Sequence, residues 1–241
     1  MAWLNGQPVA SISVVKYGAD YGFLGFYIVH PDHRGTGIGI SIWNAGMDYL
    51  ANRTVGLDGV VEQVGNYEKS GFVKAGRNIR YTGAPNFEQA ATPDLLVRKI
   101  GPDDIDKVVA YDRPFYQADR ESFIKAWIDP ETSPDRYTVI SESAGELVGY
   151  GTIRACRSRY KIGPLFANNP DIALAILKQL CDGLPKDSEI SLDVPATNII
   201  GSSIAIDCGL EPVFETARMY RGPHKPTDDI KIFGITTFEL G

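Results

Sequence analysis

The stretch VHPDHRGTGIGISIW (Val29–Trp43) decides the fold of this chain. A β-rich segment, YGFLGFYI, comes directly before it, and the apolar residues in its second half recur with the period of a helix. One helical stripe is formed by Ile38, Ile42, Ala45 and Tyr49. The stretch therefore predicts a strand, a glycine-rich loop and a helix in direct succession.

The glycine-rich loop predicts a binding site for an anion. Gly35, Gly37 and Gly39 let the backbone turn tightly and point N–H groups outward, where the positive end of the following helix adds to them. Arg34 adds a full charge, so phosphate or diphosphate is the natural ligand; a glycine-rich turn without a ligand is the alternative. A Walker loop is excluded because the chain has no Gly-Lys pair, and a dinucleotide fingerprint because Ile40 replaces its last glycine.

The amino-acid composition limits the classes of protein to which this chain can belong. The 241 residues carry a net charge of −6, with 44% hydrophobic and 22% charged residues, which suits two globular domains and argues against a nucleic-acid binder. No signal peptide and no apolar run of membrane-spanning length is present, so we expect a cytoplasmic protein without a membrane partner. Three cysteines and three histidines without ligand spacing predict neither a disulfide framework nor a metal site.

The two halves of the sequence repeat each other. NGQPVASISVVKYG matches AGELVGYGTIRACR with an offset of 139 residues between Gly6 and Gly145, and the offset between Gly71 and Gly209 in the next matching segments is 138. The repeat predicts an α/β (α+β) fold of two tandem mixed-sheet domains, in residues 1–84 and 94–241, joined by a linker in residues 85–93.

The first copy is shorter at its front than the second. About 50 residues (94–143) precede the repeated hairpin in the second copy and carry a strand and two helices, whereas only residues 1–4 stand there in the first. The first copy is therefore predicted to be truncated, and an in-frame stretch of about 45 residues upstream would show that the start is wrong. We expect the apolar face left uncovered to be filled by the second copy or by a neighbouring chain in a homodimer.

Two motifs carry a resemblance to a known family. V-x-P-x-x-R-G-x-G-I-G resembles the acetyl-CoA motif of the GNAT superfamily of N-acetyltransferases, whose core [RQ]-x-x-G-x-[GA] is met here by Arg34, Gly37 and Gly39. NYEKSGF resembles that family's Y-x-x-x-G-F segment, with Tyr67 at its start. The motifs and the order of elements cover residues 5–83, and the second half is similar to the C-terminal half of bacterial tandem-GNAT proteins.

The resemblance implies acetyl-CoA as cosubstrate and assigns residues to it. The pantetheine arm would pair with the backbone of Tyr27, Ile28 and Val29. The diphosphate would lie on the amides of Arg34, Gly35, Thr36, Gly37, Ile38 and Gly39. Tyr67 falls at the family's position for the acid that protonates the leaving thiolate, a role that a hydroxyl with a pKa near 10 can fill; a core tyrosine is its alternative.

The predicted function is acetyl-CoA-dependent N-acetyltransfer, by direct transfer, to a primary amine of a small molecule. Asp20 and Glu62 are candidate bases, and water is the alternative. A CoA or acyl-CoA sensor without turnover, and an interaction protein without CoA, are the competing functions.

The second copy is predicted to be degenerate. It has FANNPDIA where the first copy has its glycine loop, and Asp171 in the first helical turn would repel phosphate. Ala205 stands at the position of Tyr67.

Overall fold

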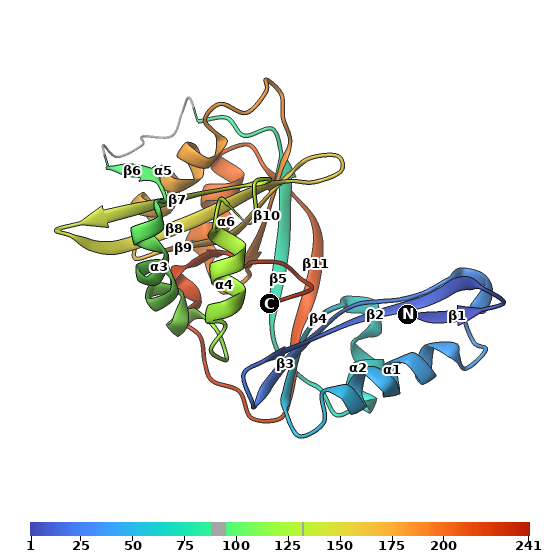
Figure 1. Cartoon of the computed structure of the whole chain (residues 1–241). Helices are drawn as coiled ribbons and strands as arrows, with labels where there is room; N and C mark the ends of the chain where they lie inside the picture. Colours follow the sequence, from blue (N-terminus) through green and yellow to red (C-terminus); the bar gives the residue numbers. More distant parts are fainter. Residues whose placement is uncertain (88–94, 132) are drawn as a thin grey trace. The chain divides into compact units, whose positions relative to one another are not determined.

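The computed structural model describes residues 1–87, 95–131 and 133–241, which form two compact units (Figure 1). Unit 1 consists of Met1–Ala75, Thr216–Lys225 and Phe238–Gly241, and unit 2 of Gly76–Glu215 and Pro226–Thr237. Of the predicted linker, residues 85–87 are described and form no helix or strand, and residues 88–93 lie outside the described residues. None of the described helices has both the length and the apolar character needed to cross a membrane.

Unit 1 is a mixed sheet with the strand order β1-β2-β3-β4-β11. The strands that it uses are β1 (Ala2–Leu4), β2 (Gln7–Tyr17), β3 (Tyr21–Val29), β4 (Thr54–Val60) and part of β11 (Glu211–Arg221). Its helical segments are η1 (Pro31–His33), α1 (Ile38–Tyr49), η2 (Val61–Gln63) and α2 (Val64–Lys69). Strands β3 and β4 run parallel and the other pairs antiparallel, while α1 packs on β2 and β3 and α2 on β4.

Unit 2 has the strand order β5-β10-β9-β8-β7-β6, with β12 on β9 (Figure 1). Its strands are β5 (Val73–Gly83, the greater part), β6 (Val97–Lys99), β7 (Arg136–Ser143), β8 (Glu146–Ala155), β9 (Tyr160–Ala167), β10 (Ile190–Pro195) and β12 (Ile232–Gly234). Its helical segments are η3 (Pro102–Asp104), α3 (Ile105–Asp112), η4 (Arg113–Phe115), α4 (Glu121–Ile128), α5 (Pro170–Cys181), α6 (Ile199–Asp207) and η5 (Asp229–Lys231).

Helices cover both faces of the unit 2 sheet. Gly149 and Gly151 of β8 lie against Ile176 of α5, whereas the Tyr150 hydroxyl between them donates to Asp112 at the end of α3. Because alternate strand residues point to opposite faces, α5 and α3 lie on opposite sides of the sheet. In unit 2, helices α3 and α4 precede the β7–β8 hairpin. In residues 1–75, no helix precedes the β2–β3 hairpin.

The predicted α/β fold and the tandem repeat are confirmed by the order of the elements. The series hairpin, helix, strand, helix, strand occurs twice, as β2 to β5 and again as β8 to β11. Each half also gives its last strand to the other unit: Asn78–Gly83 of β5 pair with β10, and Thr216–Arg221 of β11 pair with β4. The compact units therefore cut across the sequence halves, and the boundaries 1–84 and 94–241 stay a prediction at the level of sequence.

An arginine–aspartate pair holds each exchanged strand in register. Arg218 of β11 lies opposite Asp58 of β4 and donates to both carboxylate oxygens, with Nε–Oδ1 and Nη2–Oδ2 distances of 2.8 and 2.7 Å. Arg80 of β5 does the same to Asp193 of β10 at 2.7 and 2.8 Å. Both aspartate side chains are fully buried, so each carboxylate needs a cationic partner; Asp58 has Arg218, and Asp193 has Lys161 at 2.7 Å in addition to Arg80.

Strands β1 and β3 of unit 1 carry exposed apolar side chains. Trp3, Phe26 and Ile28 are 62%, 57% and 55% exposed. Coverage of exposed apolar surface by the second copy or by a neighbouring chain stays a prediction.

Replacing Asp58 with Asn should lower the free energy of unfolding by about 3 kcal/mol, because it leaves the Arg218 guanidinium without its carboxylate. Denaturant unfolding measures the loss. The matched control is Glu215→Gln, which breaks the exposed pair with Arg77 (3.0 Å) and should cost less than about 1 kcal/mol. Equal losses in the two variants would contradict a structural role for the buried pair.

Candidate functional site

A wedge opens between the parallel strands β3 and β4. Their pairing runs from Tyr21 and Thr54 to Leu24 and Leu57. Beyond it, Gly25–Val29 continue β3, while Asp58–Val60 continue β4 and pair with β11 instead. We call these two segments the β3–β4 wedge. The edge of β3 that faces β4 is thus left without a strand partner in this fully described part of the chain, which is the geometry that an extended ligand needs.

A β-bulge shapes the β3 side of the wedge. Phe26 and Tyr27 together oppose one residue of β2, and Phe26 has a φ of +48°, which is uncommon for a residue with a side chain. The Ser11 hydroxyl donates to the Phe26 carbonyl at 3.1 Å and holds this conformation. Tyr27 of the bulge lies against α1, and the side chain of Ile28, which follows it, is exposed.

The glycine loop follows β3 and forms the start of α1. Gly35 and Gly37 have φ values of +76° and +88°, and a side chain at either position would meet nothing within 4 Å. Both are therefore required for backbone conformation and not for space. Gly37 is the N-cap of α1 and gives no side-chain hydrogen bond to the first turn, so the N–H groups of that turn are not capped by a side chain.

Gly39 has a different role from the other two glycines. A methyl group at this position would lie 2.8 Å from the Tyr27 hydroxyl oxygen and 3.2 Å from Cγ2 of Val29. Its absence lets the first turn of α1 approach the end of β3. The uncapped helix start and the open edge of β3 are thereby brought together.

Arg34 connects the loop to the wide end of the β3–β4 wedge, at Val29. Its Nε donates to the Val29 carbonyl at 3.2 Å, and its side chain is exposed. The Thr36 hydroxyl donates to the His33 carbonyl at 2.7 Å and fixes the turn. The structure therefore brings the predicted residues from Arg34 to Gly39 to the end of the predicted strand segment Tyr27–Val29, with the loop open to solvent.

Tyr67 reaches the same place from α2. Its ring stacks on Trp43 of α1 with centroids 5.8 Å apart, and Trp43 meets Tyr27 edge-on at 5.2 Å. The ring also lies directly on Gly59 of β4, where a methyl group would overlap it. Burial raises the pKa of Tyr67 above its ordinary value of 10.0, and the neighbouring Tyr27 adds to this rise, so the hydroxyl stays protonated at neutral pH.

Trp43 and Gly59 are site residues that the motifs did not predict. The predicted α1 stripe is wrong in part: Ile42 is buried as expected, but Ala45 and Tyr49 are exposed, and Trp43 and Gly46 are buried instead. The sequence signal for Trp43 was the presence of a tryptophan four residues after Gly39, in the helix that follows the glycine loop.

The two candidate bases lie at different places. Asp20 is in the turn before β3, at the end away from the wedge, and lies seven positions before Tyr27, or about 23 Å along an extended strand. It therefore cannot act in the wedge. Glu62 lies in η2, directly after β4, and is exposed near the mouth of the wedge.

In unit 2, the chain itself fills the place that corresponds to the β3–β4 wedge of unit 1. Pairing of β9 with β10 ends at Ile162 and Leu192, and β12 then pairs with β9 through Ile232 and Phe166. The Ile235 N–H donates to the Asp193 carbonyl at 2.9 Å, which closes the β10 side.

The helix start in unit 2 is closed as well. The Asn169 side chain caps α5 by accepting from the Ile172 N–H at 3.0 Å, and Asp171 adds a negative charge to the first turn. Ala205, at the position of Tyr67, is completely buried. The second copy thus presents neither an open strand edge nor an uncapped helix start, in agreement with its predicted degeneracy.

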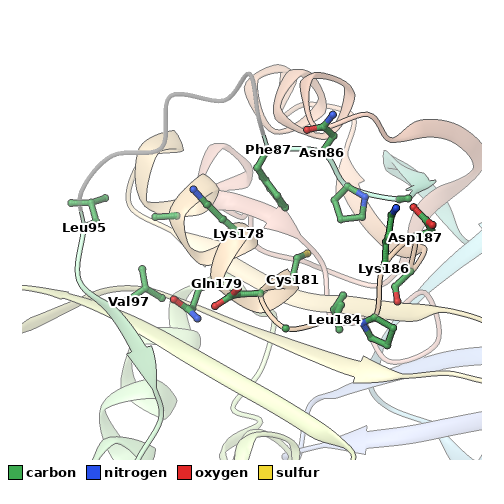
Figure 2. Close-up of a pocket in the computed structure, with 17 residues that line it drawn as sticks. Asn86, Phe87, Leu95, Val97, Lys178, Gln179, Cys181, Leu184, Lys186 and Asp187 are labelled. Carbon is green, nitrogen blue, oxygen red and sulfur yellow. The ribbon is translucent and has the colours of Figure 1, made fainter.

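Unit 2 also contains a pocket of about 890 Å³, beside α5 (Figure 2). Lys178, Gln179 and Cys181 line it, together with Phe87 and Leu95. None of the predicted site residues lines this pocket. Burial raises the pKa of Cys181 to about 12, so its thiol is not a nucleophile at neutral pH. Among the described residues, no group of three or more His, Cys, Asp or Glu side chains could hold a metal ion.

Comparisons with known protein families give two matches. Residues 108–234 match a domain described as "acetyltransferase (GNAT) domain", and residues 1–72 match the "acetyltransferase (GNAT) family".

Individual proteins agree with these matches. Holothin acyltransferase of Pseudoalteromonas sp. (strain SANK 73390) is 32% identical over 241 residues, covering 100% of this chain and 80% of the relative. A putative acetyltransferase from Pyrococcus horikoshii shares the fold with a TM-score of 0.80 and 21% identity, over 99% of this chain and 78% of that chain. A tandem GNAT protein from the clavulanic acid biosynthesis pathway has a TM-score of 0.61 and 13% identity, over 94% of this chain and 82% of its own.

Replacing Gly59 with Ala should displace the Tyr67 ring without changing its hydroxyl, because the added methyl overlaps the ring. We expect the free energy of unfolding to fall by about 1–3 kcal/mol and the near-ultraviolet circular dichroism of the stacked Trp43 to change. Gly65→Ala, on α2 itself, is the control: its methyl meets nothing within 4 Å, and it should not destabilise the chain. An unchanged spectrum in Gly59→Ala would contradict the packing of Tyr67 on β4.

Proposed function

The chain belongs to the GNAT acetyltransferase family, and on this premise we propose that unit 1 transfers an acetyl group from acetyl-CoA to a primary amine of a small molecule. Acyl transfer is the activity of the family. The choice of acetyl-CoA, of an amine and of a small acceptor is our proposal. The observation that carries it is the meeting, in unit 1, of an uncapped helix start, an open strand edge and a half-buried tyrosine.

The residues of the wedge fit the parts of acetyl-CoA. The N–H groups between Arg34 and Gly39 suit the diphosphate, because the two positive-φ glycines and the helix start direct donors outward and Arg34 adds charge. The pantetheine amides suit the open backbone of Tyr27, Ile28 and Val29. The thioester then lies beside the aromatic cluster of Tyr27, Trp43 and Tyr67.

Direct transfer makes one bond and breaks one. The lone pair of a neutral amine attacks the thioester carbonyl carbon, the new C–N bond forms and the C–S bond breaks. Tyr67 gives its proton to the leaving sulfur and regains one from solvent, while the amine nitrogen loses its extra proton to water. The raised pKa of Tyr67 keeps this proton in place at the pH at which amines become neutral.

Two observations bear on the choice of an amine acceptor and on the identity of the acyl group. The relative with 32% identity is named for acyl transfer with holothin, and its name does not restrict the acyl group to acetyl. The net charge of −6 does not repel a cationic amine. Glu62 is the remaining candidate base of the two, and water is its alternative.

Replacing Arg34 with Ala should weaken binding of CoA about tenfold or more, because a charge-assisted hydrogen bond to the diphosphate is lost. The affinity of the parent chain should also fall with added salt, and that of the variant less so. Isothermal titration with CoA measures both. Lys74→Ala, an exposed cation in the same unit, is the control and should leave the affinity unchanged. Equal affinities of the parent and Arg34→Ala would contradict the diphosphate site.

Replacing Tyr67 with Phe should lower kcat about 100-fold with little change in the KM for acetyl-CoA, because only the proton donor is removed. Thiol release from acetyl-CoA with a panel of amines measures this. For the parent, kcat should rise with pH as the amine becomes neutral and fall only above pH 10, since the pKa of Tyr67 is raised; Tyr67→Phe should lack that fall. Binding of CoA without thiol release would favour the sensor function instead.

A further inference from the structure

The segment Phe238–Gly241 belongs to unit 1 and lies on Gly25 of β3. A methyl group at Gly25 would be 2.7 Å from Cα and 2.8 Å from the carbonyl oxygen of Glu239, so two stretches of backbone are in direct contact. The hydroxyl of Tyr17, which is 4% exposed, donates to the Leu240 carbonyl at 3.1 Å. The segment is therefore held at a fixed place on the sheet.

Gly25 marks the narrow end of the β3–β4 wedge. It is the first residue after the last pair, Leu24 with Leu57, and it directly precedes the bulge at Phe26. The glycine loop is at the other end, beyond Val29. The five residues from Gly25 to Val29 are separated by four strand steps, which span about 13 Å. A linear ligand that enters at the loop and follows β3 therefore meets Glu239 at its far end.

Unit 2 shows the same contact independently. Gly163 is the first residue after the last β9–β10 pair, and a methyl group there would strike the Ile235 and Thr236 carbonyl oxygens. There the chain fills the whole wedge, because Ile232–Gly234 continue as a strand on β9. One continuous stretch, residues 232–241, thus fills the wedge of unit 2 and covers only the narrow end in unit 1.

We infer that Phe238–Gly241 sets the length of the acyl group that unit 1 accepts. The inference rests on the proposed function, in which pantetheine follows β3 and places the thioester near Tyr27. The acyl carbons then extend toward Gly25, where Glu239 stops them. An acetyl group ends before this contact, and each further methylene must displace a segment that packs on Gly25 and is bound through Tyr17.

The test is kcat/KM for thiol release across acetyl-, butanoyl-, hexanoyl- and octanoyl-CoA with one amine. The parent should lose at least tenfold between acetyl- and octanoyl-CoA. Deleting Phe238–Gly241 should raise the octanoyl-to-acetyl ratio at least tenfold, since the wall is removed. Tyr17→Phe, which removes the hydroxyl that donates to the Leu240 carbonyl, should shift the ratio in the same direction by a smaller factor and keeps the test valid if the deletion does not fold.

Tyr49→Phe is the matched control, because this tyrosine of α1 is 53% exposed and makes no contact with the segment. Its octanoyl-to-acetyl ratio should equal that of the parent, and the CoA affinity of all variants should be retained. Thiol release with an unchanged ratio in both the deletion and Tyr17→Phe would overturn this inference alone. A parent chain that releases no thiol from any member of the series would overturn the proposed function and this inference with it.

Discussion

Each exchanged strand is held in place by a bidentate arginine–aspartate pair, and the wedge of unit 1 depends on this interaction. Asp58 is the first β4 residue beyond the pairing with β3, and Arg218 of β11 binds both of its carboxylate oxygens. With β11 on its far side, β4 has a fixed partner and can leave β3 without losing its own hydrogen bonds. Because the aspartate is fully buried, an unpaired carboxylate there would be strongly unfavourable, so the exchange and the ion pair stabilise each other.

The wedge and the glycine loop form one site because of packing at two glycines. Gly39 lets α1 approach the end of β3, and Gly59 lets the Tyr67 ring lie on β4. Trp43 contacts both Tyr27 and Tyr67, so one aromatic cluster joins β3, α1 and α2. The loop, the strand edge and the proposed proton donor are therefore positioned by a single aromatic cluster.

The two units use one fold in two ways. Both have a strand pair that parts after a short parallel segment, at Gly25 in unit 1 and at Gly163 in unit 2. In unit 2 the space is taken by β12 and the helix start is capped by Asn169. In unit 1 the helix start has no side-chain cap and only the narrow end of the wedge is covered. Strand edges and helix ends require hydrogen-bond partners, and the chain itself supplies them in unit 2. In unit 1 we propose that the cosubstrate supplies them.

By itself the sequence determined what short-range pattern encodes. The strand–loop–helix at Val29–Trp43 and the position of Tyr67 follow from spacing within about 40 residues. The tandem repeat and the loss of the loop in the second copy follow from comparing segments 138 or 139 residues apart in the sequence. Only the tertiary structure decided which strands are exchanged, which face of α1 is buried, and what covers Gly25. The buried face of α1 depends on its packing against β2 and β3. The strand exchange and the cover of Gly25 depend on contacts between residues 113, 160 and 223 positions apart, in Arg80–Asp193, Asp58–Arg218 and Tyr17–Leu240. Local periodicity fixes the direction of a side chain from its own strand or helix, but it carries no information about the partner that a distant segment brings to it.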